Sequence, residues 1–521
     1  MNGLRRSWFV LFLLLSSAPV AAQTTLVDLM PDGVETNEPC IAIDPANPAI
    51  QILGGNTSLF FVSQDGGFTW SPRDLNPKEG FYGDPVVFIS RKGIQYLAHL
   101  SQNPAKKWPE QFDRIVFEHS KDGGNSFIST GVGFHPGKVQ DKPWMAVDES
   151  KKSKYRDRVY LSWTEFDAYG SKLSSDSSRI RVSWSDDEGS VFAEPVVVSD
   201  TAGDAADDDN TLEGATIATG PKGEVYCVWA GKGRLWFDKS LDGGKTWGKD
   251  NAIDKQVDGW NQNVKGLMRT NSMPFLTANK KGWLFLVFGD KRNGDYDVFL
   301  KVSKDGGITW TEARRLNNDG LKNGRDQYMP SICRDRKTDR MYITWYDRRH
   351  SENNLYTDVY VARFKGEKTG RQMRITNQSF CAPGRGVFFG DYISVAAERK
   401  EVRIAPTLYD HDKAMATVQV ALLNDKILKK VKSNEKPPFL QVLPFRDSGL
   451  LSLHFELPGY TSCTVKIKRG EQLFFTQLFE GVNGNPQELL LPLSKFSAGV
   501  YRVILSFKGR EIERNLYLEG R

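Results

Sequence analysis

The sequence predicts an all-β protein: a seven-bladed β-propeller, with six blades as the alternative, followed by a small β-sandwich. An octet that contains an aspartate recurs five times, a second motif opens seven apolar strands, and the character of the sequence changes after about Lys432. The composition, with 39% hydrophobic residues, 47 Gly and 24 Pro, is typical of a folded chain rich in turns. It excludes disorder, collagen and coiled coil as descriptions of the whole chain.

The octet reads SQDGGFTW at 63–70, SKDGGNSF at 120–127, SDDEGSVF at 185–192, SLDGGKTW at 240–247 and SKDGGITW at 303–310. Its third residues lie 55 to 65 residues apart, which is enough chain for one four-stranded antiparallel sheet in each interval. We expect a tight turn in which the Asp carboxylate accepts backbone amide hydrogen bonds and the glycines supply positive φ. The final aromatic side chain is expected to pack between neighbouring sheets. The octet is therefore interpreted as a folding device.

The second motif reads NEPCIAID at 37–44, GDPVVFIS at 83–90, DKPWMAVD at 141–148, LEGATIAT at 212–219, SMPFLTAN at 272–279, QYMPSICRD at 327–335 and GDYISVAA at 390–397. Each opener is followed by a second apolar strand, which predicts seven units. The seventh unit holds only three strands before about Asn424. The early segment TTLVDLM at 24–30 is expected to supply the missing edge strand and close the ring.

We expect three parts: a signal peptide at 1–22, the propeller at 23–432 and a C-terminal sandwich at 433–521. The leader has Arg5 and Arg6, an apolar run from Trp8 to Leu15, and small residues before Gln23. This pattern predicts a secreted or cell-surface protein, and no later stretch is long and apolar enough to span a membrane. After the linker SNEKPP at 433–438, alternating strands such as LLSLHFEL and TVKIKRG predict the sandwich.

Charge and cysteine usage narrow the function classes. The formal net charge is +6 without a long basic run, so nucleic-acid binding is not expected. Five cysteines cannot all pair, which argues against a disulfide framework, and the 6 histidines show no zinc-ligand spacing. We expect a monomer that requires no cofactor.

The octets are identified as Asp boxes, and residues 24–425 resemble the sialidase superfamily of BNR-repeat β-propellers. The resemblance implies retaining hydrolysis of an acidic glycan: three arginines hold the substrate carboxylate, a tyrosine paired with a glutamate attacks, and an aspartate is the acid. The stretch NEPCIAIDPANP lacks the first-blade arginine of that family. The C-terminal residues around Gly499-Val500-Tyr501 resemble the sorting modules of the Bacteroidetes type IX secretion system, with an Ig-like accessory module as the alternative.

In an up-and-down sheet, the loops into strand one and from strand two to three emerge on one face, opposite the Asp boxes. On the resemblance, Tyr392 is the candidate nucleophile, Glu165 its base, and Asp84 or Asp141 the acid. The candidate substrate-binding residues of this face are Arg292, Arg348, Arg349, Asp347, Asp391, Trp229 and His99. Each acid has the alternative role of accepting backbone amide bonds between blades. No catalytic metal is predicted, and a structural Ca²⁺ among the inward acids is left open.

Two functions of different kinds follow. The first is a secreted enzyme that acts on an acidic glycan or glycoconjugate, with attachment to the cell surface left open. The second is a non-catalytic propeller that binds glycan or protein at the cell surface. A propeller-type polysaccharide lyase, with His99 or His411 as the base, is a further alternative.

Overall fold

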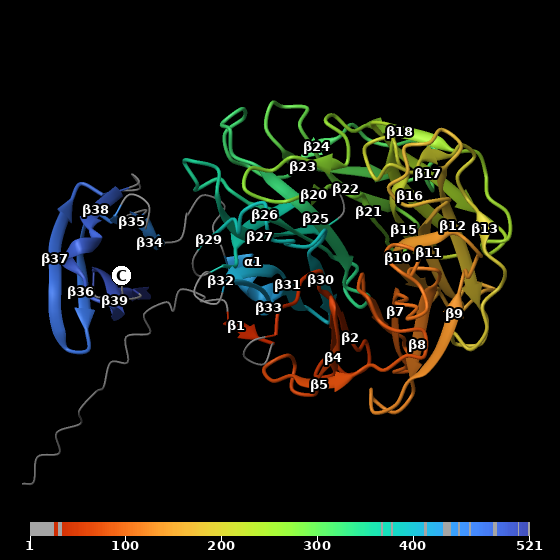
Figure 1. Cartoon of the computed structure of the whole chain (residues 1–521), viewed down its shortest axis with the longest axis horizontal. Helices are drawn as coiled ribbons and strands as arrows, with labels where there is room; N and C mark the ends of the chain where they lie inside the picture. The colour runs from red at the N-terminus through yellow and green to blue at the C-terminus, as the bar shows by residue number, and fades with distance from the viewer. Residues whose placement is uncertain are drawn as a thin grey trace, which may run out of the picture.

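The structure is a computed structural model that describes residues 25–29, 34–365, 368–376, 379–410, 414–430, 439–445, 449–457, 460–482, 487–508 and 510–518 (Figure 1). Within these residues the chain is almost entirely strand, with one α-helix, α1 (Asp425–Lys430), and one 3₁₀ helix, η1 (Leu493–Lys495). The predicted all-β class is confirmed. The expected signal peptide at 1–22 and the expected domain boundary at 432/433 lie outside the described residues.

The first three sheets are antiparallel and follow one another along the chain. Sheet 1 contains β2 (Cys40–Ile43), β3 (Gln51–Gly55), β4 (Thr57–Ser63) and β5 (Ser71–Asp74). Sheet 2 contains β6 (Val86–Ile89), β7 (Gln95–Leu100), β8 (Ile115–Ser120) and β9 (Ile128–Val132). Sheet 3 contains β10 (Val139–Val147), β11 (Val159–Phe166), β12 (Ser177–Ser185), β13 (Val196–Val197) and β14 (Gly203–Asp204).

The next two sheets are separated by a small hairpin. Sheet 4 contains β15 (Glu213–Thr219), β16 (Val225–Gly231), β17 (Arg234–Ser240) and β18 (Asn251–Lys255). The hairpin pairs β19 (Asn261–Gln262) with β20 (Thr270–Asn271). Sheet 5 contains β21 (Phe275–Ala278), β22 (Leu284–Asp290), β23 (Asp297–Ser303) and β24 (Arg314–Arg315).

The last two sheets complete the ring. Sheet 6 contains β25 (Gln327–Arg334), β26 (Met341–Asp347), β27 (Tyr356–Lys365), β28 (Lys368–Arg374) and β29 (Phe380–Cys381). Sheet 7 contains β30 (Ser394–Glu398), β31 (Glu401–Ala405), β32 (Thr407–Asp410), β33 (Met415–Asn424) and the N-terminal strand β1 (Thr25–Asp28). β1 pairs antiparallel with β33, as expected for the closing edge strand.

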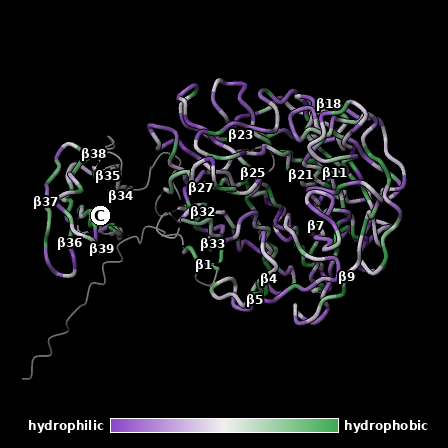
Figure 2. The backbone as a smooth tube through the Cα atoms, viewed as in Figure 1, coloured by the Kyte–Doolittle hydropathy of each residue, from purple (hydrophilic) through white to green (hydrophobic). Residues whose placement is uncertain are grey.

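The sheets are arranged radially. The first strands of the seven sheets (β2, β6, β10, β15, β21, β25 and β30) contact one another in that order, and β30 returns to β2. Figure 1 shows the colours following one another round the ring, so that the red first sheet and the blue last sheet are neighbours. Large apolar clusters fill the space between successive sheets, and Figure 2 shows hydrophilic residues along many of the surrounding loops. This arrangement is a β-propeller.

The Asp boxes form the turns that their sequences predict. In the first one, Asp65 Oδ1 accepts a hydrogen bond from the Thr69 amide at 2.9 Å, and the Gly67 amide donates to Ser63 Oγ at 2.8 Å. Gly67 has a φ of 91°, in the left-handed region that favours glycine. Trp310, which ends the fifth box, packs edge-on against Phe237 of sheet 4, with ring centroids 5.5 Å apart. The predicted packing of this aromatic side chain between neighbouring sheets is therefore observed.

The boxes share a face with the turns that join the first and second strands, and we call it the Asp-box face. Arg158, beside the turn of sheet 3, donates to the Gly243 carbonyl of the fourth box at 2.7 Å. Lys92, in the turn of sheet 2, pairs with Glu188 of the third box at 2.9 Å. The first strands therefore begin on the opposite face, which we call the loop face.

The C-terminal strands form two further sheets with a core of their own. One sheet contains β34 (Phe439–Phe445), β35 (Leu450–Glu456) and β38 (Gln487–Pro492). The other contains β36 (Ser462–Arg469), β37 (Gln472–Glu480), β39 (Gly499–Phe507) and β40 (Arg510–Leu518). Leu453, Val465 and Tyr501 belong to one buried cluster that both sheets supply. The predicted small β-sandwich is therefore observed.

Candidate active site on the loop face

The inner strands enter the ring through a repeated backbone irregularity. Glu38, Asp84 and Lys142 each precede a proline and have φ of 52°, 54° and 50°. The pairing of β10 with β11 shifts register between Asp141 and Trp144, and β15 with β16 shifts between Glu213 and Thr216. Bulges of this kind re-aim side chains, and left-handed non-glycine residues carry strain that the surrounding structure must hold. The motif that opens each sheet thereby turns polar side chains toward the centre of the loop face.

Five acids from the starts of these strands gather there. We call this set the carboxyl cluster: Glu38, Asp84, Asp141, Glu213 and Asp391. All five side chains are buried, although Asp84 and Asp141 keep 7% and 6% of their surface exposed. The cluster joins sheets 1, 2, 3, 4 and 7, because its members come from the openers of those sheets.

Hydrogen bonds hold the first two acids in place. Asn56 donates to Glu38 Oε2, and its carbonyl accepts the Asp84 amide at 2.8 Å. Glu38 Oε1 accepts the Asp391 amide at 2.9 Å, which ties sheet 1 to sheet 7. The Tyr392 hydroxyl donates to Asp84 Oδ1 at 3.3 Å. The carboxyl groups are thus fixed by neighbours from three sheets.

The cluster divides into protonated and ionised members. Burial and the charge of Asp84 raise the pKa of Glu38 well above its ordinary value. Burial raises the pKa of Asp141 in the same way, with Asp84 adding to the shift and Lys142 opposing it. Burial also acts on Asp84, but Lys142 and the hydrogen bonds from Glu38 and Asp141 outweigh it and lower the Asp84 pKa. Asp84 is therefore the carboxyl group of these three that ionises most readily, and it is hydrogen-bonded to both Glu38 and Asp141.

Two cations balance the remaining charge. Lys142 Nζ lies 2.7 Å from Asp391 Oδ2, and Arg269 Nε donates to Asp391 Oδ1 at 3.0 Å. Arg269 also pairs with Asp207 at 3.1 Å. Burial raises the pKa of Asp391, but Arg269 and Lys142 outweigh it and hold that pKa well below its ordinary value. The Arg269 side chain is 25% exposed, so it is the cation of this group that best reaches solvent.

Three exposed aromatic side chains come from the loops of this face, and burial, together with the nearby charges of Asp84 and Asp141, raises the pKa of Tyr82. Tyr82 comes from the loop into sheet 2, Trp108 from the loop between β7 and β8, and Phe134 from the connection to sheet 3. They are 44%, 60% and 50% exposed, respectively. Exposed aromatic side chains with a polar tip are common where proteins bind ligands.

The protonation pattern predicts a pH dependence of stability that Glu38→Gln should flatten. The raised folded-state pKa of Glu38 means that the folded protein holds a proton that the unfolded chain releases at lower pH. The wild type should therefore lose stability, relative to Glu38→Gln, as the pH rises through the ordinary Glu value toward the folded-state pKa. Urea unfolding of both proteins at about pH 4 and about pH 7.5 measures the difference. If the stabilities of the wild type and Glu38→Gln changed equally with pH, the raised pKa of Glu38 would be contradicted.

The structure brings together four of the residues predicted for the site. Asp84, Asp141 and Asp391 belong to the carboxyl cluster, and Tyr392 donates to Asp84. Burial and the charges of Asp84 and Glu38 raise the pKa of Tyr392 well above its ordinary value, so its hydroxyl keeps its proton. Among these four, Asp84 has a lowered pKa and Asp141 a raised one.

The predicted base and the predicted arginines have other partners. Glu165 Oε1 accepts from Arg181 Nη2 at 2.6 Å, and its Oε2 lies 3.2 Å from His135 Nδ1. Arg292 pairs with Asp290 at 2.6 Å, and Arg349 pairs with Asp347 at 2.6 Å.

Arg348 is fully buried. It donates to Thr357 Oγ1 at 3.0 Å and to the Lys265 carbonyl at 2.8 Å. Each of the three arginines is thus engaged within its own part of the fold.

The remaining two predicted residues are fully buried. Trp229 lies in the apolar cluster between sheets 3 and 4. His99 Nδ1 lies 2.9 Å from the Leu100 carbonyl, and its Nε2 is 3.7 Å from Glu118 Oε2. Phe81 covers the His99 ring at a centroid distance of 4.3 Å. Both residues lie on strand positions that point into the protein.

Sequence reasoning missed Arg269 and the aromatic side chains. Arg269 lies between β19 and β20, in a connection that is not part of either repeat. The length of the chain between β18 and β21 is the sequence feature that could have pointed to a functional residue there. Tyr82 and Trp108 lie in loops whose ends were assigned to the loop face, but neither is part of an opener.

In the described part of the chain, no group of three or more His, Cys, Asp or Glu side chains is arranged to hold a metal ion. All five cysteines are free. No helix among the described residues has the length and apolar character that crossing a membrane requires.

Comparisons with known proteins find similarity only among solved structures. No family model matches the chain, and no curated protein matches it. An α-L-arabinofuranosidase from Fusarium graminearum is 12% identical, with a TM-score of 0.43 over 66% of this chain and 98% of the other. The leech intramolecular trans-sialidase is 11% identical, with a TM-score of 0.41 over 63% and 68%. The NanB sialidase from Streptococcus pneumoniae is 8% identical, with a TM-score of 0.43 over 73% and 84%. The structural neighbours of this chain thus include sialidases and an arabinofuranosidase.

Proposed function

We propose that the protein acts on glycans at the loop face and hydrolyses a glycosidic bond with the carboxyl cluster. The feature that carries the proposal is a buried set of carboxyl groups in which the pKa of Asp84 is lowered, while burial raises the pKa values of Glu38 and Asp141 well above their ordinary values. Glycoside hydrolysis needs a proton donor for the leaving oxygen and a carboxylate that attacks or activates water. Both kinds of group are present within one buried set, next to exposed aromatic side chains.

Each residue has a role in this proposal. Asp141 protonates the leaving oxygen, because it is protonated and keeps a small exposed surface. Asp84 is the ionised carboxylate, and Glu38 holds it in place through their hydrogen bond. Arg269 meets the acidic group of the substrate, so the substrate class that we propose is an acidic glycan.

Secretion is part of the same proposal. The leader at 1–22 and the C-terminal sandwich support export and a role outside the cell or at its surface. The resemblance at Gly499-Val500-Tyr501 supports a sorting role for that sandwich. Mass spectrometry of the mature chain in the culture medium tests this, because it gives the first and last residues directly.

Asp84→Asn is expected to reduce hydrolysis by about 10²–10⁴-fold, since the amide cannot act as a carboxylate. A panel of sialylated, uronate-containing, sulfated and neutral glycans provides the substrates. Asp167→Asn is the matched control, because Asp167 is paired with Lys138 at 2.6 Å and with Arg179 at 2.9 Å outside the cluster. Asp141→Asn should slow a natural linkage far more than an aryl glycoside with a good leaving group.

The same glycan panel distinguishes an enzyme that hydrolyses glycans from a protein that only binds them. The engagement of Arg292, Arg348 and Arg349 by their own neighbours favours the second candidate, a non-catalytic propeller that binds glycan through its aromatic side chains. Glycan binding without turnover, unchanged in Asp84→Asn, would establish that candidate and reject hydrolysis.

A further inference from the structure

A second polar site lies on the other face of the ring. A cavity of about 710 Å³ is lined by the inner strands of all seven sheets and by the turns that follow them, so it opens on the Asp-box face. Its volume lies within the range of sites that take small molecules. Ser331 and Thr277 contribute hydroxyl groups to its wall, and Phe88 and Trp144 contribute aromatic rings. The carboxyl cluster is on the opposite face and shares none of these residues.

The opening of this cavity is strongly cationic. Eight of the lining residues are lysine or arginine and two, Glu149 and Glu398, are acidic. The exposed cations come from the turns of sheets 2, 3, 5, 6 and 7: Arg91, Lys151, Lys152, Lys280, Lys337 and Arg399. We call these six the basic ring.

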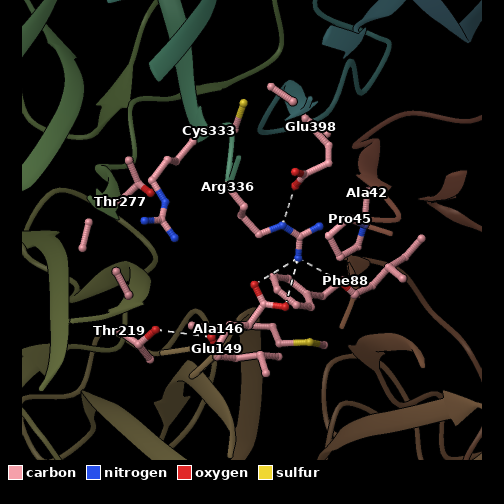
Figure 3. A pocket seen from close by; sticks show the side chains of 18 of the residues that line it. Ala42, Pro45, Phe88, Ala146, Glu149, Thr219, Thr277, Cys333, Arg336 and Glu398 are labelled. Atoms are coloured by element: carbon pink, nitrogen blue, oxygen red, sulfur yellow. Dashed lines mark hydrogen bonds and ion pairs between the residues drawn. The ribbon is translucent and has the colours of Figure 1, made fainter. Parts of the chain in front are cut away.

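The two acids of the cavity offset only part of the basic ring. Arg336, whose side chain is 13% exposed, donates to Glu398 Oε2 at 2.8 Å and to Glu149 Oε2 at 3.2 Å, so one guanidinium engages both carboxylates (Figure 3). Arg91 is 3.8 Å from Glu149. Among the described residues, no acid lies within ion-pair distance of Lys152, Lys280 or Lys337, so three exposed ammonium groups face the opening without a carboxylate.

The surroundings of the basic ring select a compact anion over a flat anionic surface. The Asp boxes lie outside the ring on the same face, and hydrogen bonds from Thr69 lower the pKa of Asp65 to about 2. Asp242 and Asp305 also have pKa values lowered to about 2, where hydrogen bonds from their boxes outweigh burial. Three of the boxes also contain a lysine, so the preference rests on shape: a small ligand reaches the cations around the concave opening, whereas a flat anionic surface meets only its rim.

We propose that a short anionic oligosaccharide binds at the mouth of this cavity, where its charged groups meet the basic ring. Several charges spaced along a short chain match lysines that come from different sheets around the opening. Sulfate and carboxylate groups share this chemistry. The inference is independent of hydrolysis on the loop face.

The test is a binding titration with three tetrasaccharides: a heparin-derived sulfated one, tetragalacturonate, and neutral maltotetraose. The variant Lys152→Ser/Lys280→Ser/Lys337→Ser removes one cation from each of three sheets. The control Lys78→Ser/Lys107→Ser/Lys172→Ser removes three exposed lysines from the loop face. We expect the wild type and the control to bind a charged tetrasaccharide and the ring variant to bind it about tenfold more weakly. Binding should weaken with added salt, and maltotetraose should not bind.

The outcomes separate this site from the proposed active site. Binding of only the sulfated or only the uronate tetrasaccharide supports the proposal and identifies the anionic group. Asp84→Asn should bind as the wild type does, and loss of binding in that variant would place the ligand on the loop face and overturn the proposal. Equal affinities of the ring variant and the control would also overturn it. So would binding to vesicles of anionic lipid through the same lysines without binding to either charged tetrasaccharide.

Discussion

Replacing Arg336 with methionine is expected to lower the free energy of unfolding by about 3–5 kcal/mol, because it leaves buried carboxylates without their partner. Arg336 crosses the central channel from sheet 6. It donates to the carbonyls of Ile43 at 2.8 Å and Ile89 at 2.9 Å, and it pairs with Glu149 and Glu398 (Figure 3). One side chain therefore connects sheets 6, 7, 1, 2 and 3. Urea unfolding measures the loss.

Arg91→Met is the matched control for Arg336→Met. Arg91 contacts the same Glu149, but at 3.8 Å and with 41% of its side chain exposed, so its loss should cost less than about 1 kcal/mol. Adding Glu149→Gln and Glu398→Gln to Arg336→Met should recover part of the lost stability, because the unpaired charges are then removed. Equal stabilities of Arg336→Met and Arg91→Met would contradict the role of Arg336 as a central tie.

Lys142→Met is expected to destabilise the protein by about 3–5 kcal/mol near neutral pH, because it removes a buried cation from among buried acids. Lys142 Nζ lies 2.7 Å from Asp391, and the acids Asp141, Asp391 and Asp84 outweigh burial and raise its pKa well above the ordinary value. Differential scanning calorimetry and urea unfolding measure the effect.

The loss in Lys142→Met should depend on pH. Asp391 has a lowered pKa in the folded wild type, so its contribution to stability is present above the ordinary Asp value and is lost as the pH falls toward the folded-state pKa. The difference in the free energy of unfolding between the wild type and Lys142→Met should therefore become smaller as the pH falls. Lys92→Met is the control, because its ion pairs with Asp157 and Glu188 are partly exposed and contribute less than about 1 kcal/mol. If this difference in the free energy of unfolding were the same at all pH values, the ion pair between Lys142 and Asp391 would not be its cause.

The sequence predicts the fold well because repeated features specify it. The Asp-box octet contains its own turn chemistry, so Asp65 and Gly67 behave as a local reading expects. The early strand at 24–30 was needed to complete the last sheet, and β1 occupies that place. Such features depend on neighbours along the chain or on one recurring pattern.

The candidate site was predicted only in part, for identifiable reasons. Asp84, Asp141 and Asp391 converge because equivalent openers bring them to one end of the ring. Arg269 lies in a connection without a repeat, so no pattern placed it over Asp391.

The ion pairs of Arg292 and Arg349 could have been predicted from the local sequence. Asp290 and Asp347 each lie two residues before an arginine, and that spacing forms the ion pairs to Arg292 and Arg349. Trp229 was assigned to the loop face by its place at a strand end, but strand alternation directs it into the core. Tertiary partners of buried side chains are not specified by spacing alone.

The proposed active site is tested most directly by a crystal structure of the wild type with a thio-linked, non-hydrolysable analogue of a glycan that the panel shows to be cleaved. The sugar is expected to lie over Asp84 and Asp141, with the sulfur of the linkage near the Asp141 carboxyl and an acidic group near Arg269. Binding of the analogue only at the basic ring, with no sugar at the carboxyl cluster, would contradict the assignment of the active site.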